Sequence, residues 1–431
     1  MKSLLKNIIV WILTWEARLV LKKYKPNIVA VTGNVGKTSA KDAIYTVLSN
    51  AYYVRKSEKS FNSELGVPLT ILGCGSGWNN PALWFSNILE GLSLIFLKNH
   101  YPKWLVLEIG ADRPDDIKKT ARWLCPDIVV ITRIGDVPVH IEFFQSVDDV
   151  VKEKTYLAAA VSKDGALILN GDDERVLAMK EKSRARVLTY GFDENVSMSA
   201  SNHQVVYGAN GIPEGVNFKV NYGSTSMPVQ IKGTIGRQHA YAVLAALLVG
   251  VSREINLVSA VEWLREFETP PGRLKIVEGI RHTTILDDTY NSSPMATEAA
   301  LAALKEVKTT GRKIAVLGDM LELGKHTIEE HRKAGEETAK ICDVLYAVGM
   351  RAETIAESAQ KAGMKMENII RFQDSRNAGM ALKEILKDGD IVLVKGSQSM
   401  RMERVVREVM AHPEDSEKLL VRQDEAWLAR A

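Results

Sequence analysis

Val31-Thr-Gly-Asn-Val-Gly-Lys-Thr-Ser39 is the stretch of sequence that decides the fold. The apolar run 28–31 that leads into it predicts a buried strand, and residues 37–50 predict a helix. Glycines between a strand and a helix let backbone N–H groups surround a phosphate, to which the helix N-terminus adds positive potential. Lys37 is placed to reach terminal phosphates and the Thr38 hydroxyl to bind Mg²⁺. We therefore predict a nucleotide-binding loop made of Gly33, Asn34, Val35, Gly36, Lys37, Thr38 and Ser39.

The spacing of this loop differs from the usual P-loop, GxxxxGK[ST], because Val31 stands where the first glycine belongs. A Gly-Lys-Thr triplet also occurs by chance, which is the alternative interpretation. Here the strand, the turn and the helix agree with one another, so nucleotide binding is favoured.

Length and composition limit what the chain can be. At 431 residues it is too long for one hydrophobic core, so two or three domains are expected. The formal net charge of +3 is small, and no block of Lys and Arg interleaved with aromatic residues occurs, so nucleic acid is not an implied partner. Cys74, Cys125 and Cys342 have neither zinc-site nor disulfide-framework spacing, which fits a reducing compartment. All three are interpreted as small buried apolar residues.

Strands and helices alternate after the loop. Apolar runs at 104–108, 127–132 and 166–170 predict buried strands, and residues 146–161 predict a helix. This alternation is typical of a parallel sheet that helices cover on both faces. Short alternating runs over 185–232 indicate a small antiparallel addition, and a helix is predicted at 239–249.

Thr269-Pro270-Pro271-Gly272 is the best candidate for a linker, since two prolines interrupt helix and strand alike. Beyond it, a second α/β series has predicted strands at 283–287, 313–317, 344–348 and 390–394. The prediction is an α/β protein in which a central P-loop ATPase-type parallel-sheet domain precedes a Rossmann-like C-terminal α/β domain. The expected divisions are an apolar amphipathic helix at 1–25, the nucleotide-binding domain at 26–268 and the C-terminal domain at 269–431.

Residues 1–25 are apolar and contain two tryptophans, but Lys6, Glu16 and Arg18 interrupt the run. A membrane-spanning helix needs about 20 mostly apolar residues, so this segment is a poor candidate for one. Its polar residues gather on one helical face, and tryptophan with lysine-rich flanks suits a helix lying in a membrane interface. Glu16 lies on the apolar side, which argues against deep insertion. Packing on the protein's own body or on a partner subunit is the alternative, at even weight.

The shortened loop Thr-Gly-x-x-Gly-Lys-Thr resembles that of the Mur ligases and of their folylpolyglutamate synthase relatives. Further similar segments follow in the same order over residues 27–410, and many collinear motifs are more specific than any single one. Asn62-Ser-Glu-Leu-Gly-Val-Pro-Leu-Thr70 and Leu317-Gly-Asp-Met-Leu-Glu-Leu-Gly324 are most similar to the branch of the family that adds D-alanyl-D-alanine. The other matching segments are Leu107-Glu-Ile-Gly-Ala111, His140-Ile-Glu-Phe-Phe-Gln-Ser146, Asn170-Gly-Asp-Asp173, Pro271-Gly-Arg273, Asp287-Asp-Thr-Tyr-Asn291 with Pro294, and Lys395-Gly-Ser397.

This resemblance implies an ATP-dependent, ADP-forming amide ligase that uses Mg²⁺. ATP would phosphorylate a substrate carboxylate, and the amine of a second substrate would attack the acyl phosphate. The expected partners are a carboxylate acceptor, such as a muramyl peptide of peptidoglycan biosynthesis, and D-alanyl-D-alanine or another amine. The expected location is the cytoplasm, with a possible membrane-surface association at its inner face through residues 1–25.

Roles for single residues are implied by the same resemblance. Glu108, His140 and Lys154 are expected at the metal together with Thr38, and Lys154 is expected to be carbamylated. With Lys37, these three are the expected catalytic residues; taken alone, each would be an ordinary surface or loop side chain. Arg273 is expected at the phosphates and Asp288 at the ribose hydroxyls, unless a one-residue slip gives that role to Asp287. The expected substrate contacts are Asn62, Ser63, Glu64, Asn291, Asp319, Met320 and Glu322.

Two departures from the family pattern leave alternatives open. The loop begins at Gly33, which leaves room for one helix and not for the uridine-nucleotide-binding domain of the branch it resembles. The family's GxHNxxN segment reads Gly236-Arg-Gln-His239-Ala-Tyr-Ala-Val243, without its asparagines, so how adenine is recognised stays open. An amide ligase with a polyglutamate-type or membrane-linked acceptor and a nucleotide-binding partner subunit with weak catalysis are the alternatives. The apolar stretch 84–97 could join a membrane surface, although core or dimer contacts are the favoured interpretation.

Overall fold

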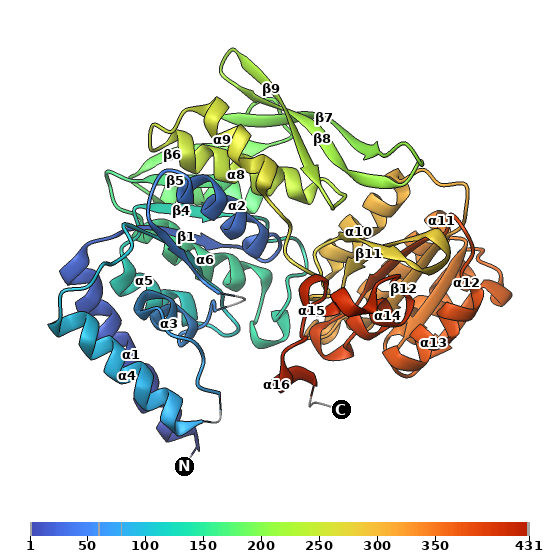
Figure 1. The fold of residues 1–431 in the computed structure, drawn as a ribbon, viewed down its shortest axis with the longest axis horizontal. Helices are drawn as coiled ribbons and strands as arrows, with labels where there is room; N and C mark the ends of the chain where they lie inside the picture. The colour runs from blue at the N-terminus through green and yellow to red at the C-terminus, as the bar shows by residue number, and fades with distance from the viewer. Residues whose placement is uncertain (1, 59–60, 79, 429–431) are drawn as a thin grey trace.

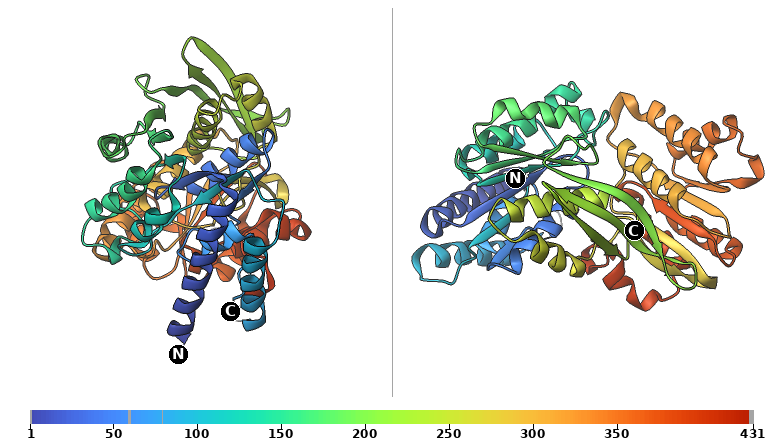
Figure 2. Two further views of the ribbon diagram at one scale, coloured as in Figure 1. Left: turned by 90° about the vertical axis from the view of Figure 1, so that its left-hand side faces the viewer. Right: turned by 90° about the horizontal axis from the view of Figure 1, so that it is seen from above.

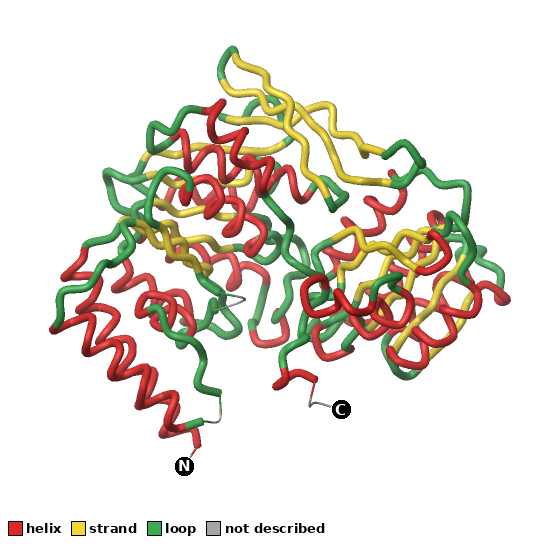
Figure 3. The backbone as a smooth tube through the Cα atoms, viewed as in Figure 1, coloured by secondary structure: helices red, strands yellow, loops and turns green. Residues whose placement is uncertain are grey.

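The computed structural model describes residues 2–58, 61–78 and 80–428, so the outermost ends of the predicted segments, Met1 and Ala431, lie outside the described residues. Two α/β units lie side by side, each built on its own sheet (Figures 1 and 3). The predicted fold class, a mainly parallel-sheet unit followed by a second α/β unit, is confirmed.

The first sheet has nine strands in the order β2-β3-β1-β4-β5-β6-β7-β8-β9. Its strands are parallel from β2 to β7, and β7, β8 and β9 pair antiparallel, as the alternating runs over 185–232 predict. The strands are β1 (Asn27–Thr32), β2 (Val54–Lys56), β3 (Trp104–Glu108), β4 (Ile128–Ile131), β5 (Ala166–Asn170), β6 (Arg186–Gly191), β7 (Met198–Tyr207), β8 (Pro213–Tyr222) and β9 (Thr225–Lys232).

Helices cover both faces of this sheet because successive side chains of a strand point to opposite sides. In β1, Val29 and Val31 belong to the core with α2 and α8, whereas Ile28 and Ala30 belong to the core with α1 and α3. The helices of this unit are α1 (Lys2–Tyr24), α2 (Lys37–Ser49), α3 (Gly66–Leu72), α4 (Pro81–Phe96), α5 (Asp116–Leu124), α6 (Val147–Ala160), α7 (Glu174–Leu177), α8 (Gln238–Val251) and α9 (Leu257–Trp263), with the short 3₁₀ turn η1 (Ile141–Phe143).

The second sheet has six strands in the order β10-β11-β15-β12-β13-β14, of which only β10 runs antiparallel to its neighbour. Residues 267–274 connect the first unit to β10 without helix or strand. The strands are β10 (Lys275–Gly279), β11 (Thr283–Asp288), β12 (Lys313–Gly318), β13 (Val344–Val348), β14 (Ile369–Phe372) and β15 (Ile391–Lys395). The helices are α10 (Pro294–Glu306), α11 (Thr327–Ile341), α12 (Ala352–Lys361), α13 (Ser375–Ile385), α14 (Glu403–Val409), α15 (Ser416–Leu419) and α16 (Glu425–Leu428), with η5 (Gly324–His326).

Helices α1 and α4 lie side by side and project beyond the first sheet (Figures 1 and 2). Leu13, Ala17 and Val20 of α1 are buried, so the helix packs on the protein's own body, one of the two predicted alternatives. Among the described residues, no helix is long and apolar enough to cross a membrane.

One prediction about burial is wrong. Cys125 is exposed because it follows the last turn of α5 in a left-handed conformation (φ 44°) at the surface, whereas Cys342 is buried and Cys74 half-buried. The core contacts predicted for the stretch 84–97 are made by one side of it, where Leu94 is buried, whereas Phe85 and Phe96 are exposed.

Candidate active site

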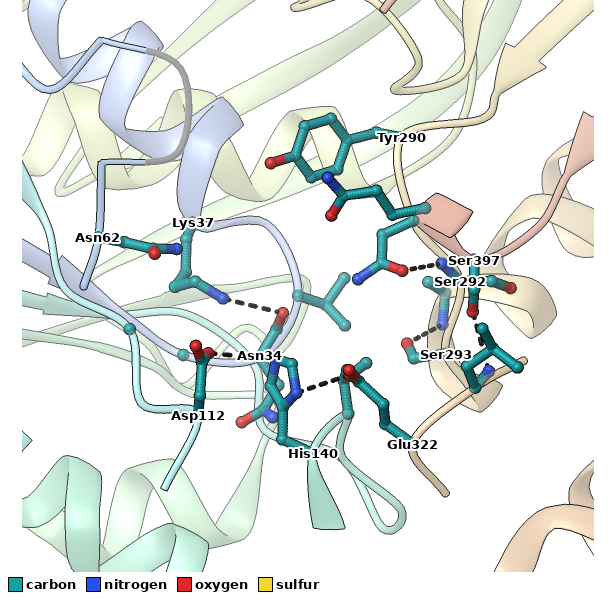
Figure 4. A pocket seen from close by; sticks show the side chains of 18 of the residues that line it. Asn34, Lys37, Asn62, Asp112, His140, Tyr290, Ser292, Ser293, Glu322 and Ser397 are labelled. Carbon is teal, nitrogen blue, oxygen red and sulfur yellow. Dashed lines mark hydrogen bonds and ion pairs between the residues drawn. The ribbon is translucent and has the colours of Figure 1, made fainter. Parts of the chain in front are cut away.

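A cavity of about 760 Å³ lies between the two units, at the carboxyl ends of β1 and β3 (Figure 4). The first unit contributes Glu108, Lys154 and part of the predicted nucleotide-binding loop 33–39, called the phosphate loop below. The loop residues in the wall are Gly33, Asn34, Val35 and Lys37. The second unit contributes Tyr290 to Ser293, Glu322 and the turn 397–401. Open α/β sheets place ligands at this edge, where strand ends and helix beginnings meet.

The phosphate loop has the conformation that its glycines predict. β1 ends at Thr32 and α2 begins at Lys37, so the loop lies between a strand and a helix N-terminus. Gly33 has φ +142°, and a Cβ there would lie 2.0 Å from Thr132 Oγ1, which only glycine avoids. Lys37 Nζ donates a hydrogen bond to the Asn34 carbonyl oxygen at 3.2 Å, curling back over the loop.

Glu108 ends β3 as a buried carboxylate, 1% exposed. Its two oxygens accept hydrogen bonds from Thr38 Oγ1 at 3.0 Å and from Asn62 Nδ2 at 3.1 Å. Thr38 and Glu108 thus put two hard oxygen donors together beside the phosphate loop, the donor type that Mg²⁺ prefers. No group of three or more His, Cys, Asp or Glu side chains that could hold a metal occurs within the described residues.

Lys154 lies on α6 and lines the cavity with its side chain 2% exposed. A capping box at Ser146 and Asp149 fixes the start of this helix. Burial, reinforced by the nearby charge of Lys37, lowers the pKa of Lys154 to about 7. Glu153, its neighbour on the helix, instead accepts hydrogen bonds from the backbone N–H groups of Asp115 and Lys118. A substantial fraction of Lys154 is therefore a neutral amine near pH 7.

The pKa of Lys37 is lowered, like that of Lys154. Burial lowers the pKa of Lys37, and the carboxylate of Glu108 partly opposes this by favouring the charged form.

His140 and Glu322 join the two units across the cavity. His140 Nδ1 lies 2.7 Å from Glu322 Oε2, and His140 Nε2 lies 3.4 Å from Asp112 Oδ1 (Figure 4). The hydrogen bond with His140 lowers the pKa of Glu322. Both residues have positive φ, 67° and 63°, a conformation that side-chain-bearing residues adopt rarely. The pair therefore brings the His140 turn of the first unit against the Glu322 turn of the second.

Arg273 reaches back from the second unit to the phosphate loop. Its Nη2 lies 3.5 Å from Thr38 Oγ1, and its guanidinium carbon lies 4.0 Å from the centre of the Tyr290 ring. His239 lies behind it, because His239 Nε2 contacts Thr234 Oγ1 at 2.8 Å and Thr234 donates to the carbonyl of Leu274. Burial lowers the pKa of His239 to about 3, so this histidine is neutral.

Several expected site residues lie outside the cavity wall. Asp288 forms an ion pair with Lys395 Nζ at 2.6 Å, and Asp287 Oδ1 accepts two hydrogen bonds from Thr289. Asp319 accepts from the backbone N–H groups of Arg351 and Ala352 at the start of α12, and Met320 is buried. Gly36, Thr38, Ser39, Ser63 and Glu64 also do not line the cavity.

The cavity wall contains residues that the sequence did not single out. Asp112 directly follows the matching segment 107–111, and Tyr290 lies inside the matching segment 287–291, although no role was assigned to either residue. Arg401 and Trp427 also line the cavity, but neither belongs to a matching segment. Trp427 comes from the C-terminal segment, which an ion pair between Arg422 and Glu403 at 2.9 Å holds against the second unit.

Two family models match the chain. The Mur ligase middle domain matches residues 86–250, and the Mur ligase glutamate ligase domain matches residues 272–398. The chain belongs to the Mur ligase family. Membership confirms the prediction of an ATP-dependent, ADP-forming amide ligase that uses ATP and Mg²⁺.

Similar proteins agree with this assignment. This Mur ligase is 27% identical to the UDP-N-acetylmuramoyl-tripeptide–D-alanyl-D-alanine ligase of Bacillus subtilis over 92% of its own length and 79% of that protein, and 26% identical to the Escherichia coli enzyme of that name over 91% and 78%. The crystal structure of MurF ligase from Thermotoga maritima in complex with ADP is 26% identical, with a TM-score of 0.76 over 95% of this chain and 84% of that one.

Proposed function

We propose that this Mur ligase joins D-alanyl-D-alanine to the free carboxylate of a muramyl-peptide precursor in peptidoglycan biosynthesis. The single observation that carries the proposal is the cavity in which the phosphate loop and Glu108 of one unit face Tyr290 to Ser293 and Glu322 of the other. Two substrates held by different units can meet there with water excluded. The names of the similar ligases support D-alanyl-D-alanine as the amine and a muramyl tripeptide as the acceptor.

The proposed roles follow from the chemistry of each side chain. The loop Gly33 to Ser39, which includes Lys37, binds the ATP phosphates. Arg273 binds the same phosphates from the second unit. Thr38, Glu108, His140 and Lys154 would hold Mg²⁺, which offsets the phosphate charge when bound. His140 would have to exchange its contact with Glu322 for this role.

Lys154 is proposed to act as a carbamate. The neutral amine adds CO₂ and loses a proton, which converts a buried cationic side chain into an anionic oxygen ligand. The low pKa of Lys154, about 7, supplies the neutral amine. Within the described part of the chain, the Lys154 amine has neither an ion pair nor a hydrogen bond.

Two bond-forming steps make up the proposed reaction. A carboxylate oxygen of the acceptor attacks the γ-phosphorus of ATP, ADP leaves, and an acyl phosphate forms. The amine then attacks the acyl carbon, loses a proton, and expels phosphate as the amide forms. Lys37 and Arg273 stabilise the charge that develops on the transferred phosphoryl group.

Substrate contacts are proposed for both units. Asn62, whose amide already holds Glu108, and Asn291 and Glu322 line the cavity and can contact the acceptor and the amine. Asp319 and Met320 support the wall from behind, next to Leu321. Ser63 and Glu64 would need the loop to move before they reach a substrate, and Asp288 would need to leave Lys395 to reach a ribose.

The proposed location is the cytoplasm, where ATP is available. Association with the membrane surface through residues 1–25 stays a proposal. The packing of α1 leaves Trp11 and Trp15 exposed, so both side chains are accessible to a membrane.

A matrix of acceptors and amines tests the proposal. Purified protein would be incubated with ATP, with each of several carboxylate acceptors and with each of several amines, and products would be identified by mass spectrometry. Amide formation and ADP release that require both muramyl tripeptide and D-alanyl-D-alanine are expected. Product with a polyglutamate-type acceptor and none with muramyl peptide would replace this substrate assignment with another ligase reaction.

A further inference from the structure

Helices α1 and α4 and their ends carry about half of the large apolar side chains that are exposed in the described part of the chain. Nine of the seventeen large apolar side chains that are exposed in the described part of the chain lie on these helices or at their ends, although the helices are a small fraction of the molecule. Exposed apolar side chains that gather on neighbouring helices mark a candidate interaction site. The nine are Ile8, Trp11, Trp15, Trp78, Leu83, Phe85, Leu89, Phe96 and Leu97.

The outer face of α4 is a continuous apolar stripe. Phe85, Leu89, Leu92 and Phe96 follow one another at spacings of four, three and four residues, which places them on one side of a helix. Phe85 is 63% and Phe96 76% exposed, and Leu92 is half-buried. The stripe therefore faces away from the core, to which Leu94 belongs and against which Trp84, Ile88 and Ile95 pack.

The two helices are held rigidly against each other, so the surface is already formed. Lys23 Nζ of α1 donates to the carbonyl oxygens of Leu94 at 2.9 Å and Ile95 at 3.1 Å, at the end of α4. Tyr24 stacks on Tyr101 with ring centres 4.6 Å apart. Both helices start at the free tip of the projection and run in the same direction, away from the second unit (Figures 1 and 2).

Charge distinguishes among the possible partners of this surface. Residues 1–25 and 78–103 together contain eight Lys or Arg and two Glu, a net charge of +6, whereas the entire chain carries +3. The remainder of the protein is therefore net negative, at −3. One of the two acids, Glu16, is fully buried. Arg18 and Lys22 of α1 and Lys25 directly after it are exposed. Two copies of the chain meeting through this surface would bring like charges together, which disfavours a dimer.

We propose that α1 and α4 dock the enzyme on the surface of an anionic lipid bilayer. Exposed tryptophan and phenylalanine insert into the boundary between headgroups and acyl chains, and the basic side chains contact anionic headgroups. The docked helices lie on the bilayer and do not cross it. This inference goes beyond the ligase reaction and does not depend on which acceptor the enzyme uses.

Vesicle co-sedimentation of the full chain tests the inference. The wild type is expected to sediment with vesicles that contain phosphatidylglycerol. Its binding to pure phosphatidylcholine vesicles is expected to be at least tenfold weaker. Phe85→Ser/Leu89→Ser/Phe96→Ser is expected to lose binding by more than tenfold. Each basic residue at an anionic surface strengthens binding about fivefold, so Arg18→Gln/Lys22→Gln/Lys25→Gln is expected to weaken it roughly a hundredfold.

A matched control removes three exposed apolar side chains elsewhere. Val258→Ser/Ile328→Ser/Met366→Ser changes residues that are 60%, 72% and 69% exposed and is expected to bind vesicles like the wild type. Circular dichroism of every variant checks that the fold is retained. Wild-type protein that stays in solution, or a stripe variant that binds like the wild type, would overturn the inference. So would a wild-type dimer in gel filtration that the stripe variant dissociates, because the stripe would then be a subunit interface.

Discussion

Replacing Glu16 with glutamine is expected to stabilise the protein at alkaline pH and to leave it almost unchanged in acid. The Glu16 side chain lies between α1 and α4 with no exposed surface, and neither carboxyl oxygen has a hydrogen-bond partner. Gly91 of α4 leaves the space for it, because a Cβ there would lie 2.2 Å from Glu16 Oε2. Burial alone raises the pKa of Glu16 from 4.5 to about 7.

The sign and size of the effect follow from this shift. The folded protein holds the proton more tightly than the unfolded chain, so stability is greatest below pH 4.5, falls between pH 4.5 and 7, and is constant above. The loss is about 3 kcal/mol at pH 8 and less than about 1 kcal/mol at pH 5. Glutamine cannot ionise and removes this difference. Cys74 interacts with Glu16, and burial raises the pKa of this thiol to about 11, outside this range.

Urea unfolding of the wild type and Glu16→Gln at pH 5 and pH 8 measures the effect. Glu90→Gln, on the exposed side of the same helix pair, is the control and is expected to keep the wild-type pH dependence. Equal changes in unfolding free energy between the two pH values for wild type and Glu16→Gln would refute the reasoning.

Three more predictions follow from the site and the core. In ¹³C NMR with labelled bicarbonate, the wild type is expected to show a carbamate signal that Lys154→Arg lacks; a wild type without the signal would exclude the carbamate. Arg273→Lys keeps the charge but loses the planar stacking on Tyr290, so kcat/KM for ATP is expected to fall about 10- to 100-fold, and an unchanged value would remove Arg273 from the phosphate site. Leu107→Ala in the fully buried β3 is expected to lower the unfolding free energy by about 2–5 kcal/mol, measured in urea, and a loss under about 1 kcal/mol would show that the site refills.

Local sequence signals predicted much of the fold. The apolar run at 28–31 with glycines and a helix behind it fixes β1, the phosphate loop and α2, because the strand, turn and helix are all specified by neighbouring residues. Four apolar runs after the linker became β11, β12, β13 and β15 for the same reason. Their order in the sheet is a long-range property that the runs do not contain.

Burial of apolar helices was harder to predict. The stretch 84–97 is apolar on nearly every side, so composition favours a core helix. Only the position of α4 at the edge of the fold shows that one face lacks a neighbour. Glu16 was correctly placed on the apolar side of α1, but its enclosure by Gly91 depends on a residue 75 positions away.

The site shows the same division. Motif similarity brought Lys37, Glu108, His140, Lys154 and Arg273 to attention, and the structure gathers these five around one cavity. The contact of His140 with Glu322 and the place of Trp427 in the wall arise from how the second unit and the C-terminal segment pack. Asp288 was expected at a ribose, but its carboxylate forms an ion pair with Lys395. Neither the segment 287–291 nor the segment 395–397 indicates this ion pair by itself.

An isotope experiment tests the acyl-phosphate reaction most directly. Muramyl tripeptide with ¹⁸O in its acceptor carboxylate would be converted with ATP and D-alanyl-D-alanine, and the released phosphate would be analysed by mass spectrometry. The account predicts one ¹⁸O in each phosphate, because the attacking carboxylate oxygen leaves with the phosphoryl group, and no phosphate release by Lys37→Ala. Phosphate without ¹⁸O, or equal release by Lys37→Ala, would contradict it.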